Sequence, residues 1–488
     1  MNVKHLLQRI AASLFLLGWL AGCADTQLTE GGIGGTGISL GPITGFGSII
    51  QNGVRYDVST AHFYRDGALV GGQNAYQIGE IVTIYGTIQS DGINGVAQQV
   101  EASRSLYGMV TAHNGNNLTL LGQTVHADSL TLFHGFSLLT EVVVGNMLEV
   151  SGVRDAQGVI RASSITRRAN SFTPGVSSQV LAGYISQVDS TNQTFVLHGL
   201  TIDYSQAMLN ALPGGQPTVN QYVQVTSQQA VQNQRLLASL VSAGSAYPAF
   251  SNGTKIELEG VITAFAHPSH FLLNGQAIVA TANTEYEHGT VSDLKLNAHI
   301  EVEGTANAAG ELVAEEISIR QTSGTAPLKL EGTISTLDAA SQTLTLMGNT
   351  LVVDTRTILL EEVNDEDVSI RFADLRVNDL LEVKAMPLAN GQLLALRIDR
   401  ETPDASGERE LQGVVSQVDA ANGTFSILGI SILVNDQTEF ESASGESLSR
   451  NDFFAALVEG ESIVQVEGTD LGSNWLQANK LEITNGDD

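Results

Sequence analysis

One alternation of apolar and polar residues is repeated six times along the chain, and residues 329–354 show it most clearly. Apolar residues alternate with polar ones along this stretch, most regularly in Thr343–Met347. This is the period of a β-strand with one buried face. Gly348–Asn349 interrupts the alternation and offers the positive φ that a tight hairpin needs. The stretch predicts three antiparallel strands, with turns near Asp338–Gln342 and Gly348–Asn349.

The other five copies each begin with a glycine followed by an apolar run, and these glycines are Gly41, Gly108, Gly183, Gly260 and Gly413. The second half of the copies also repeats: a turn feeds a fourth strand, as in Val144–Gly152, and a fifth strand follows, as in Leu312–Ile319. The piece between strands three and four varies. Ser449–Asp452 before Phe453 resembles a capping box, so we expect one or two helical turns in this link.

Three strands, a short helical link and two further strands are typical of a five-stranded Greek-key barrel of OB type. We therefore predict an all-β protein of tandem small five-stranded OB-like barrels with short helical links. The repeats are expected at residues 41–104, 105–168, 181–243, 256–320, 329–400 and 410–484. The third repeat is the most divergent, because glutamines stand in its last two strands where other copies carry Glu and Gly.

The N-terminus has the pattern of an export signal. Lys4 and Arg9 precede an apolar run, Ile10–Leu20, that is too short to span a bilayer, and the run ends in Leu-Ala-Gly-Cys. This ending resembles a bacterial lipobox, which predicts a signal peptide at 1–22, lipidation of Cys23 and a glycine-rich tether at 23–40. The alternative is an ordinary secretory signal with an incidental cysteine. Asp25 stands one place beyond the position that favours inner-membrane retention, so we expect the outer membrane.

Cys23 is the only cysteine of the chain, so the mature protein has neither an internal disulfide nor a thiol nucleophile. Acidic residues number 52 against 23 Lys and Arg, for a net charge of −29. OB barrels often bind oligonucleotides. Phosphate binding requires a positive surface, however, so we expect no nucleic-acid partner.

Candidate chemistry is sparse. The closest histidine pair, His267 and His270, has no third ligand nearby in sequence, and the chain carries neither a GxSxG nor an HExxH motif. Paired-carboxylate chemistry stays open because acids are plentiful. An acidic cluster in the link of the fifth repeat comprises Glu361, Glu362, Asp365, Glu366 and Asp367. Such oxygen-rich loops suit calcium, so a cation site is one hypothesis and a solvated acidic loop is the other. We expect no other cofactor.

The motifs permit a resemblance. The glycine-rich segment Gly31–Gly37, the stretches Gly41–Ile49 and Asn52–Asp57, and the repeated Val-Glu-Gly strand endings at Gly304 and Gly468 resemble envelope proteins of the domain of unknown function 5666 family. The resemblance implies β-barrel repeats exported to the bacterial envelope and supplies no catalytic residues.

We therefore expect a lipid-anchored protein of the cell envelope with a non-catalytic binding or structural role, and not an enzyme. Its contacts would be the membrane, through the lipid, and an envelope protein or polysaccharide. Its orientation, periplasmic or surface-exposed, stays open. The alternative is an envelope hydrolase acting on polysaccharide, in which one repeat would carry polar residues without counterparts elsewhere.

Overall fold

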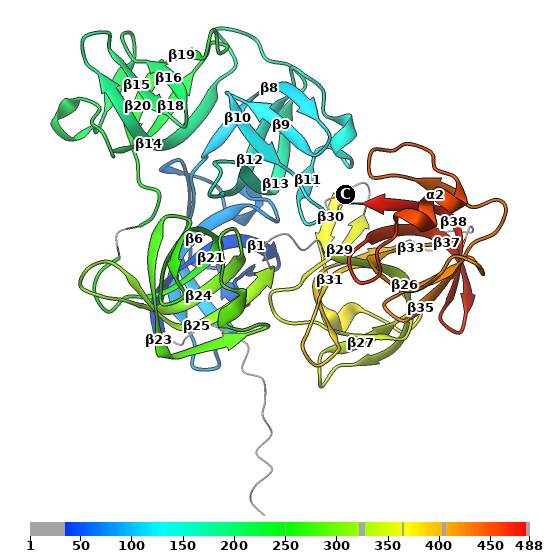
Figure 1. Cartoon of the computed structure of the whole chain (residues 1–488). Helices are drawn as coiled ribbons and strands as arrows, with labels where there is room; N and C mark the ends of the chain where they lie inside the picture. The colour runs from blue at the N-terminus through cyan, green and yellow to red at the C-terminus, as the bar shows by residue number, and fades with distance from the viewer. Residues whose placement is uncertain (1–34, 249, 322–326, 364–365, 403–406, 485–488) are drawn as a thin grey trace, which may run out of the picture. The chain divides into compact units, whose positions relative to one another are not determined.

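The computed structural model describes residues 35–248, 250–321, 327–363, 366–402 and 407–484. The predicted signal peptide and Cys23 lie outside these residues. The described part is mostly β, with 57% strand and a single short α-helix (Figure 1). Its strands form three mixed sheets of 12, 13 and 13 strands. Each sheet contains two barrels built on the same five-strand plan, which we call barrels 1 to 6 in chain order.

The first three barrels share one element order. Barrel 1 contains β1 (Gly35–Gly45), β2 (Ile49–Gln51), β3 (Val54–Asp57), β6 (Ile81–Ile88) and β7 (Asn94–Ala102), with β4 (His62–Arg65), β5 (Ala68–Leu69) and η1 (Gln73–Ala75) in its link. Barrel 2 contains β8 (Leu106–Asn114), β9 (Asn117–Leu120), β10 (Gln123–His126), β12 (Met147–Arg154) and β13 (Ile160–Ala169), with β11 (Leu132–His134) and η2 (Leu139–Glu141) in its link. Barrel 3 contains β14 (Gln179–Asp189), β15 (Thr194–Leu197), β16 (Leu200–Asp203), β18 (Tyr222–Ser227), β19 (Arg235–Leu237) and β20 (Leu240–Ala243), with β17 (Met208–Asn210) and η3 (Pro213–Gly215) in its link.

The last three barrels follow the same order. Barrel 4 contains β21 (Lys255–His267), β22 (His270–Leu273), β23 (Gln276–Glu287), β24 (His299–Ala306) and β25 (Leu312–Gln321), with η4 (Val291–Asp293) in its link. Barrel 5 contains β26 (Leu328–Asp338), β27 (Thr343–Leu346), β28 (Asn349–Val352), β31 (Leu380–Pro387) and β32 (Leu393–Glu401), with β29 (Ile358–Val363), β30 (Glu366–Ser369) and η5 (Phe372–Asp374) in its link. Barrel 6 contains β33 (Glu408–Asp419), β34 (Thr424–Ile427), β35 (Ile430–Leu433), β37 (Ile463–Gly472) and β38 (Trp475–Thr484), with β36 (Glu439–Glu441) and α2 (Arg450–Ala456) in its link.

Every barrel has the strand order of an OB fold. In barrel 5, β26, β27 and β28 form an antiparallel meander, β28 pairs parallel with β32, and β31 pairs with both β32 and β26 to close the ring. The same pairings close barrels 1, 2, 4 and 6. In barrel 3 the fifth strand is broken into β19 and β20, which interrupts the ring. The prediction of tandem five-stranded OB-like barrels with short helical links is confirmed.

Strand pairs also join the barrels within each sheet. β8 pairs antiparallel with β14, and β26 pairs antiparallel with β33, so barrels 2 and 3 and barrels 5 and 6 are joined to their chain neighbours. Barrels 1 and 4 are distant in sequence, yet β1 pairs parallel with β21, with Gly37 opposite Lys255. A Cβ at Gly37 would lie 2.7 Å from the carbonyl oxygen of Lys255, so the close approach requires glycine here.

Two local expectations were wrong, and one feature of the links was not expected. Residues 35–40, predicted as tether, form the first half of β1, because their glycines permit close strand pairing and do not make the segment flexible. The barrel 5 hairpin turns at Met347–Gly348, one residue earlier than predicted, since both residues have positive φ and Asn349 already pairs in β28. In five barrels the link also holds a short strand parallel to the fifth strand, such as β11 on β13.

The repeated glycine of the Val-Glu-Gly strands has a structural cause. Gly86, Gly152, Gly304 and Gly468 each lie where the register between strands four and five shifts by a bulge. At each of them a Cβ would collide with the backbone of the fifth strand. Barrel 5 has Ala385 at the equivalent shift. The glycine therefore marks a bulge that bends each barrel closed.

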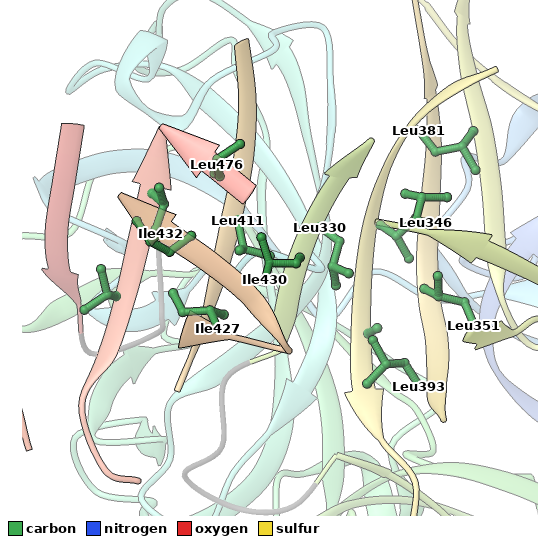
Figure 2. Packing of buried hydrophobic residues seen from close by; sticks show 14 of the residues in the cluster. Leu330, Leu346, Leu351, Leu381, Leu393, Leu411, Ile427, Ile430, Ile432 and Leu476 are labelled. Atoms are coloured by element: carbon green, nitrogen blue, oxygen red, sulfur yellow. The ribbon is translucent and has the colours of Figure 1, made fainter. Parts of the chain in front are cut away.

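Apolar cores fill the barrels. The largest cluster is continuous through barrels 5 and 6: Leu330 of β26 and Leu411 of β33 lie between the groups contributed by the two barrels (Figure 2). In barrel 6, helix α2 adds Phe453, which is fully buried. Ser449 caps this helix as predicted, and its hydroxyl accepts a hydrogen bond from the Asp452 N–H at 3.2 Å.

Candidate functional site at the junction of barrels 1, 4 and 5

The most unusual side chain of the described chain is Arg356, which lies in the segment between β28 and β29. The carboxylate of Asp354 accepts hydrogen bonds from the N–H groups of Arg356 at 2.9 Å and Thr357 at 2.8 Å, which fixes a tight turn. The Thr357 hydroxyl donates to the carbonyl of Ala395 on β32 at 2.7 Å. The turn is thus fastened to barrel 5 on both sides, and it projects the Arg356 side chain out of that barrel.

The Arg356 guanidinium enters a group of glutamates on barrel 4. Its Nε lies 2.5 Å from Glu301 Oε2, and its Nη2 lies 3.6 Å from Glu303 and 3.8 Å from Glu316. Its Nη1 lies 3.7 Å from Glu287. The Arg356 side chain is only 3% exposed, yet none of its three nitrogens has a hydrogen bond of good geometry within the described residues. The charged groups are therefore close together, but they do not form hydrogen bonds of good geometry.

The sheet geometry places these glutamates together. Glu301 and Glu303 are two residues apart on β24, so both point to the same face. Glu303 lies opposite Glu257 of β21 on one side and opposite Glu316 of β25 on the other. Like charges directly opposite one another destabilise a sheet. This row lies on the outer face of barrel 4, since the intervening Ile300 and Val302 fill the barrel core.

Two of the surrounding contacts cross between barrels, and a third lies within barrel 4. The Tyr56 hydroxyl of barrel 1 donates to Glu257 Oε2 at 3.4 Å. Arg320 at the end of β25 forms a buried ion pair with Asp354 at 3.0 Å. His299 lies 3.1 Å from Glu259. The junction is thus built from three barrels that contribute a tyrosine, a glutamate row and an Asp-Arg turn.

The electrostatics of the junction are uneven. Burial, followed by the charge of neighbouring carboxylates, raises the pKa of Glu257 and Glu303. Burial also raises the pKa of Glu301, although Arg356 opposes the shift. Burial would raise the pKa of Asp354 as well, but the charges of Arg320 and Arg356 outweigh it and lower that pKa to about 2. The single guanidinium stabilises some carboxylates as anions and leaves others favoured as neutral acids.

The arrangement can hold protons and can hold three barrels together. Glu301 and Glu303 are almost completely buried. Glu287 and Glu316 form the outer rim, with side chains 28% and 24% exposed, so protons reach the group from solvent there. Arg356 and Asp354 of barrel 5 both form ion pairs with residues of barrel 4.

The acidic cluster predicted from the sequence is arranged differently. Glu361 forms an ion pair with Arg400 of β32, and Glu362 and Asp367 lie opposite each other on exposed strands of the β29–β30 hairpin. Glu366 is a residue of β30, and Asp365 lies outside the described residues. Within the described ranges no group of three His, Cys, Asp or Glu side chains could hold a metal ion. The calcium hypothesis for the complete loop stays a prediction.

His267 and His270 lie opposite each other at the end of the β21–β22 hairpin. Ser269 lies between them, with its Oγ 2.8 Å from His267 Nδ1 and 3.0 Å from His270 Nδ1. Both histidines are exposed. The arrangement is a solvated polar turn.

Sequence reasoning missed the junction. Its only signal was the alternation of glutamates with core residues in Ile256–Glu259 and Ile300–Glu303. Such a pattern is typical of a solvent-facing strand surface, and nothing in it shows that two other barrels cover that surface.

Comparisons with known proteins agree with the repeat pattern. No curated protein matches the chain. Within the described residues, no helix has the length and apolar character needed to cross a membrane. The model of one family, described as a domain of unknown function (DUF5666), matches four segments, residues 107–166, 259–318, 331–399 and 412–482. These segments are barrels 2, 4, 5 and 6 and together span more than half of the sequence, so the chain belongs to the DUF5666 family.

Proposed function

We propose that this chain is a lipid-anchored, non-catalytic scaffold of the bacterial cell envelope. The observation that carries the proposal is the use of its buried charges: Arg356, Asp354 and the barrel 4 glutamates are engaged in holding barrels against one another. Strand pairs between β1 and β21, and between β26 and β33, add continuous sheets across barrel boundaries. Buried charges with cross-barrel partners favour a structural role over a catalytic one.

A repeated surface supports a binding role for this scaffold. The turn before the fourth strand carries an apolar residue at its corner in five barrels. In barrel 1 this residue, Ile78, is buried against Leu132 of barrel 2 and Leu360 of barrel 5. Its counterparts include Val144 and Val377, which are 64% and 49% exposed. The corner residue that packs between barrels in barrel 1 is thus exposed to solvent in other barrels. Such repeated exposed apolar corners are expected of an array that contacts an envelope protein or polysaccharide at several places.

The sequence supports the anchor. The basic and apolar run before Cys23 has the features of a lipoprotein signal, and mature lipoproteins carry several acyl chains, which makes attachment effectively stable. Ala24, rather than an aspartate, follows the cysteine, which favours the outer membrane.

The test is fractionation of cells that express the full chain. Cys23→Ser removes the only thiol, so we expect the variant to leave the membrane fraction, whereas Ala24→Asp should keep the lipid and move the protein to the inner membrane. Retention of Cys23→Ser in outer membranes would overturn the anchor. Release of reducing ends from envelope polysaccharide by the purified wild-type protein would overturn the non-catalytic role and favour a hydrolase.

A further inference from the structure

We infer that the junction of barrels 1, 4 and 5 is a proton-operated latch, closed while its carboxyl groups hold protons and opened when they ionise. The geometry carries this inference. Four carboxyl groups, those of Glu287, Glu301, Glu303 and Glu316, lie within 4 Å of one guanidinium in a largely buried space, and Glu257 lies opposite Glu303 on the neighbouring strand. Full ionisation would leave several negative charges without a counter-ion, which a buried site does not tolerate.

Unmade hydrogen bonds point the same way. Both carboxylate oxygens of Glu301 and one oxygen each of Glu257, Glu287 and Glu303 have no hydrogen-bond partner among the described residues. A proton on such an oxygen turns an acceptor into a donor, so that neighbouring carboxyl groups can share hydrogen bonds as in an acid pair. Protons are therefore the ligand that this group of oxygens takes.

Every element that packs on the group contributes a titratable or charged side chain. β21 supplies Glu257 and Glu259, β23 ends with Glu287 and is followed by His288, β24 supplies His299, Glu301 and Glu303, β25 supplies Glu316 and Arg320, β3 supplies Tyr56, and the turn of barrel 5 supplies Asp354 and Arg356. Arg320 forms an ion pair with Asp354, and His299 lies 3.1 Å from Glu259. Arg356 is then the one guanidinium left to face the five remaining carboxyl groups.

The direction of the pH dependence follows from these groups. Burial and then neighbouring carboxylates raise the pKa of Glu316 to about 7, of Glu257 to about 8 and of Glu303 to about 10. In the open junction these side chains meet water and return towards the ordinary glutamate pKa of about 4.3. The closed form thus binds more protons than the open form, and its stability falls as the pH rises from the ordinary glutamate pKa of about 4.3 through the raised pKa values.

The latch is specific to barrel 4. At the positions of Glu301 and Glu303, barrel 6 has Gln465 and Glu467, and barrel 2 has Glu149 and Ser151. In barrel 6, Lys480 opposes Glu467 across the sheet. Barrel 4 of this chain therefore contacts two others, barrels 1 and 5, through its carboxyl groups. The inference does not depend on the lipid anchor or on the proposed partner.

The experiment measures hydrogen exchange of the full-length protein at pH 5, 7 and 9, corrected for the intrinsic pH dependence of amide exchange. We expect protection of residues 353–360 to fall at least tenfold between pH 5 and pH 9, while β37 and β38 of barrel 6 keep theirs. Glu303→Gln keeps the shape of a neutral carboxyl group but cannot ionise, so it should retain most of this protection at pH 9. Glu467→Gln, at the same position of barrel 6, is the matched control and should behave as the wild type at the junction.

A conventional ion-pair network would give the opposite sign, because ionised glutamates bind Arg356 more strongly. Protection that stays constant or rises from pH 5 to pH 9 would therefore overturn the latch. Equal exchange in Glu303→Gln and Glu467→Gln at pH 9 would also overturn it. The protection of β37 and β38 reports in each sample whether the variant is folded.

Discussion

Gly304→Ala tests whether the bulge in β24 needs a glycine for barrel 4 to close without strain. A Cβ at this position would lie 2.8 Å from the carbonyl carbon of Val313 and 3.0 Å from Leu312 Cδ1, and closer still to the carbonyl oxygen of Val313. The nearest atoms belong to the backbone of β25, so no side-chain rotation relieves the clash. The two strands must move apart by a large fraction of an ångström at the point where barrel 4 closes.

Overpacking of this kind costs about 1–3 kcal/mol. Since about 1.4 kcal/mol changes an equilibrium tenfold, this is roughly a 5- to 150-fold increase in amide exchange from opening of barrel 4. The assay is hydrogen exchange followed by mass spectrometry, which reports β24 and β25 separately from the other barrels. Barrel 6 serves as an internal reference within the same sample.

Gly71→Ala is the matched control, because no atom lies within 4 Å of its Cβ position and its φ is not in the left-handed region. It should leave exchange unchanged or slow it slightly. Unchanged exchange of β24 and β25 in Gly304→Ala would refute the reasoning, since the bulge would then accept a methyl group as barrel 5 does at Ala385.

Two further substitutions test barrel 6. Phe453→Ala removes a fully buried ring that packs against Phe425, Phe440 and Phe454. It should destabilise the barrel by about 3–5 kcal/mol, measured by urea denaturation with hydrogen exchange of β37 as the readout. A loss below about 1 kcal/mol would contradict this packing. Ser449→Ala removes the N-cap of α2 and should cost about 0.5–2 kcal/mol in the same assay. Ser447→Ala, two residues earlier, should cost less, and equal losses would show that the cap contributes nothing.

The architecture was predictable because its signals are local. The alternation in residues 329–354 and its five copies predicts strands. Ser449–Asp452 predicts a helix start, and both signals agree with the structure. The parallel link strands were missed, because a piece such as Leu132–His134 is too short for periodicity to show. The hairpin turn at Met347 was misplaced, since methionine is an uncommon residue at positive φ.

The junction of barrels 1, 4 and 5 was not predictable from one sequence. The outward glutamates at Glu257 and Glu301 have the spacing of a solvated strand face, and Arg356 stands among ordinary link residues. Only the packing of barrels distant in the chain gives these residues their burial. The acidic cluster at Glu361 was conspicuous in sequence because its charges are close in the chain. In the structure Glu361 pairs with Arg400, and Glu362 and Asp367 are exposed.

The parallel pairing of β1 with β21 bears on how the protein is made. Barrel 1 is synthesised first. The edge of β1 at Gly37–Leu40 can pair with β21 only after barrels 2 and 3 and then Lys255–Leu258 have been synthesised. During that interval the nascent chain exposes a strand edge that can capture another chain. Rapid completion of barrel 4, or a chaperone bound to this edge, would protect the growing polypeptide, and a chain truncated before Lys255 would keep the edge open permanently.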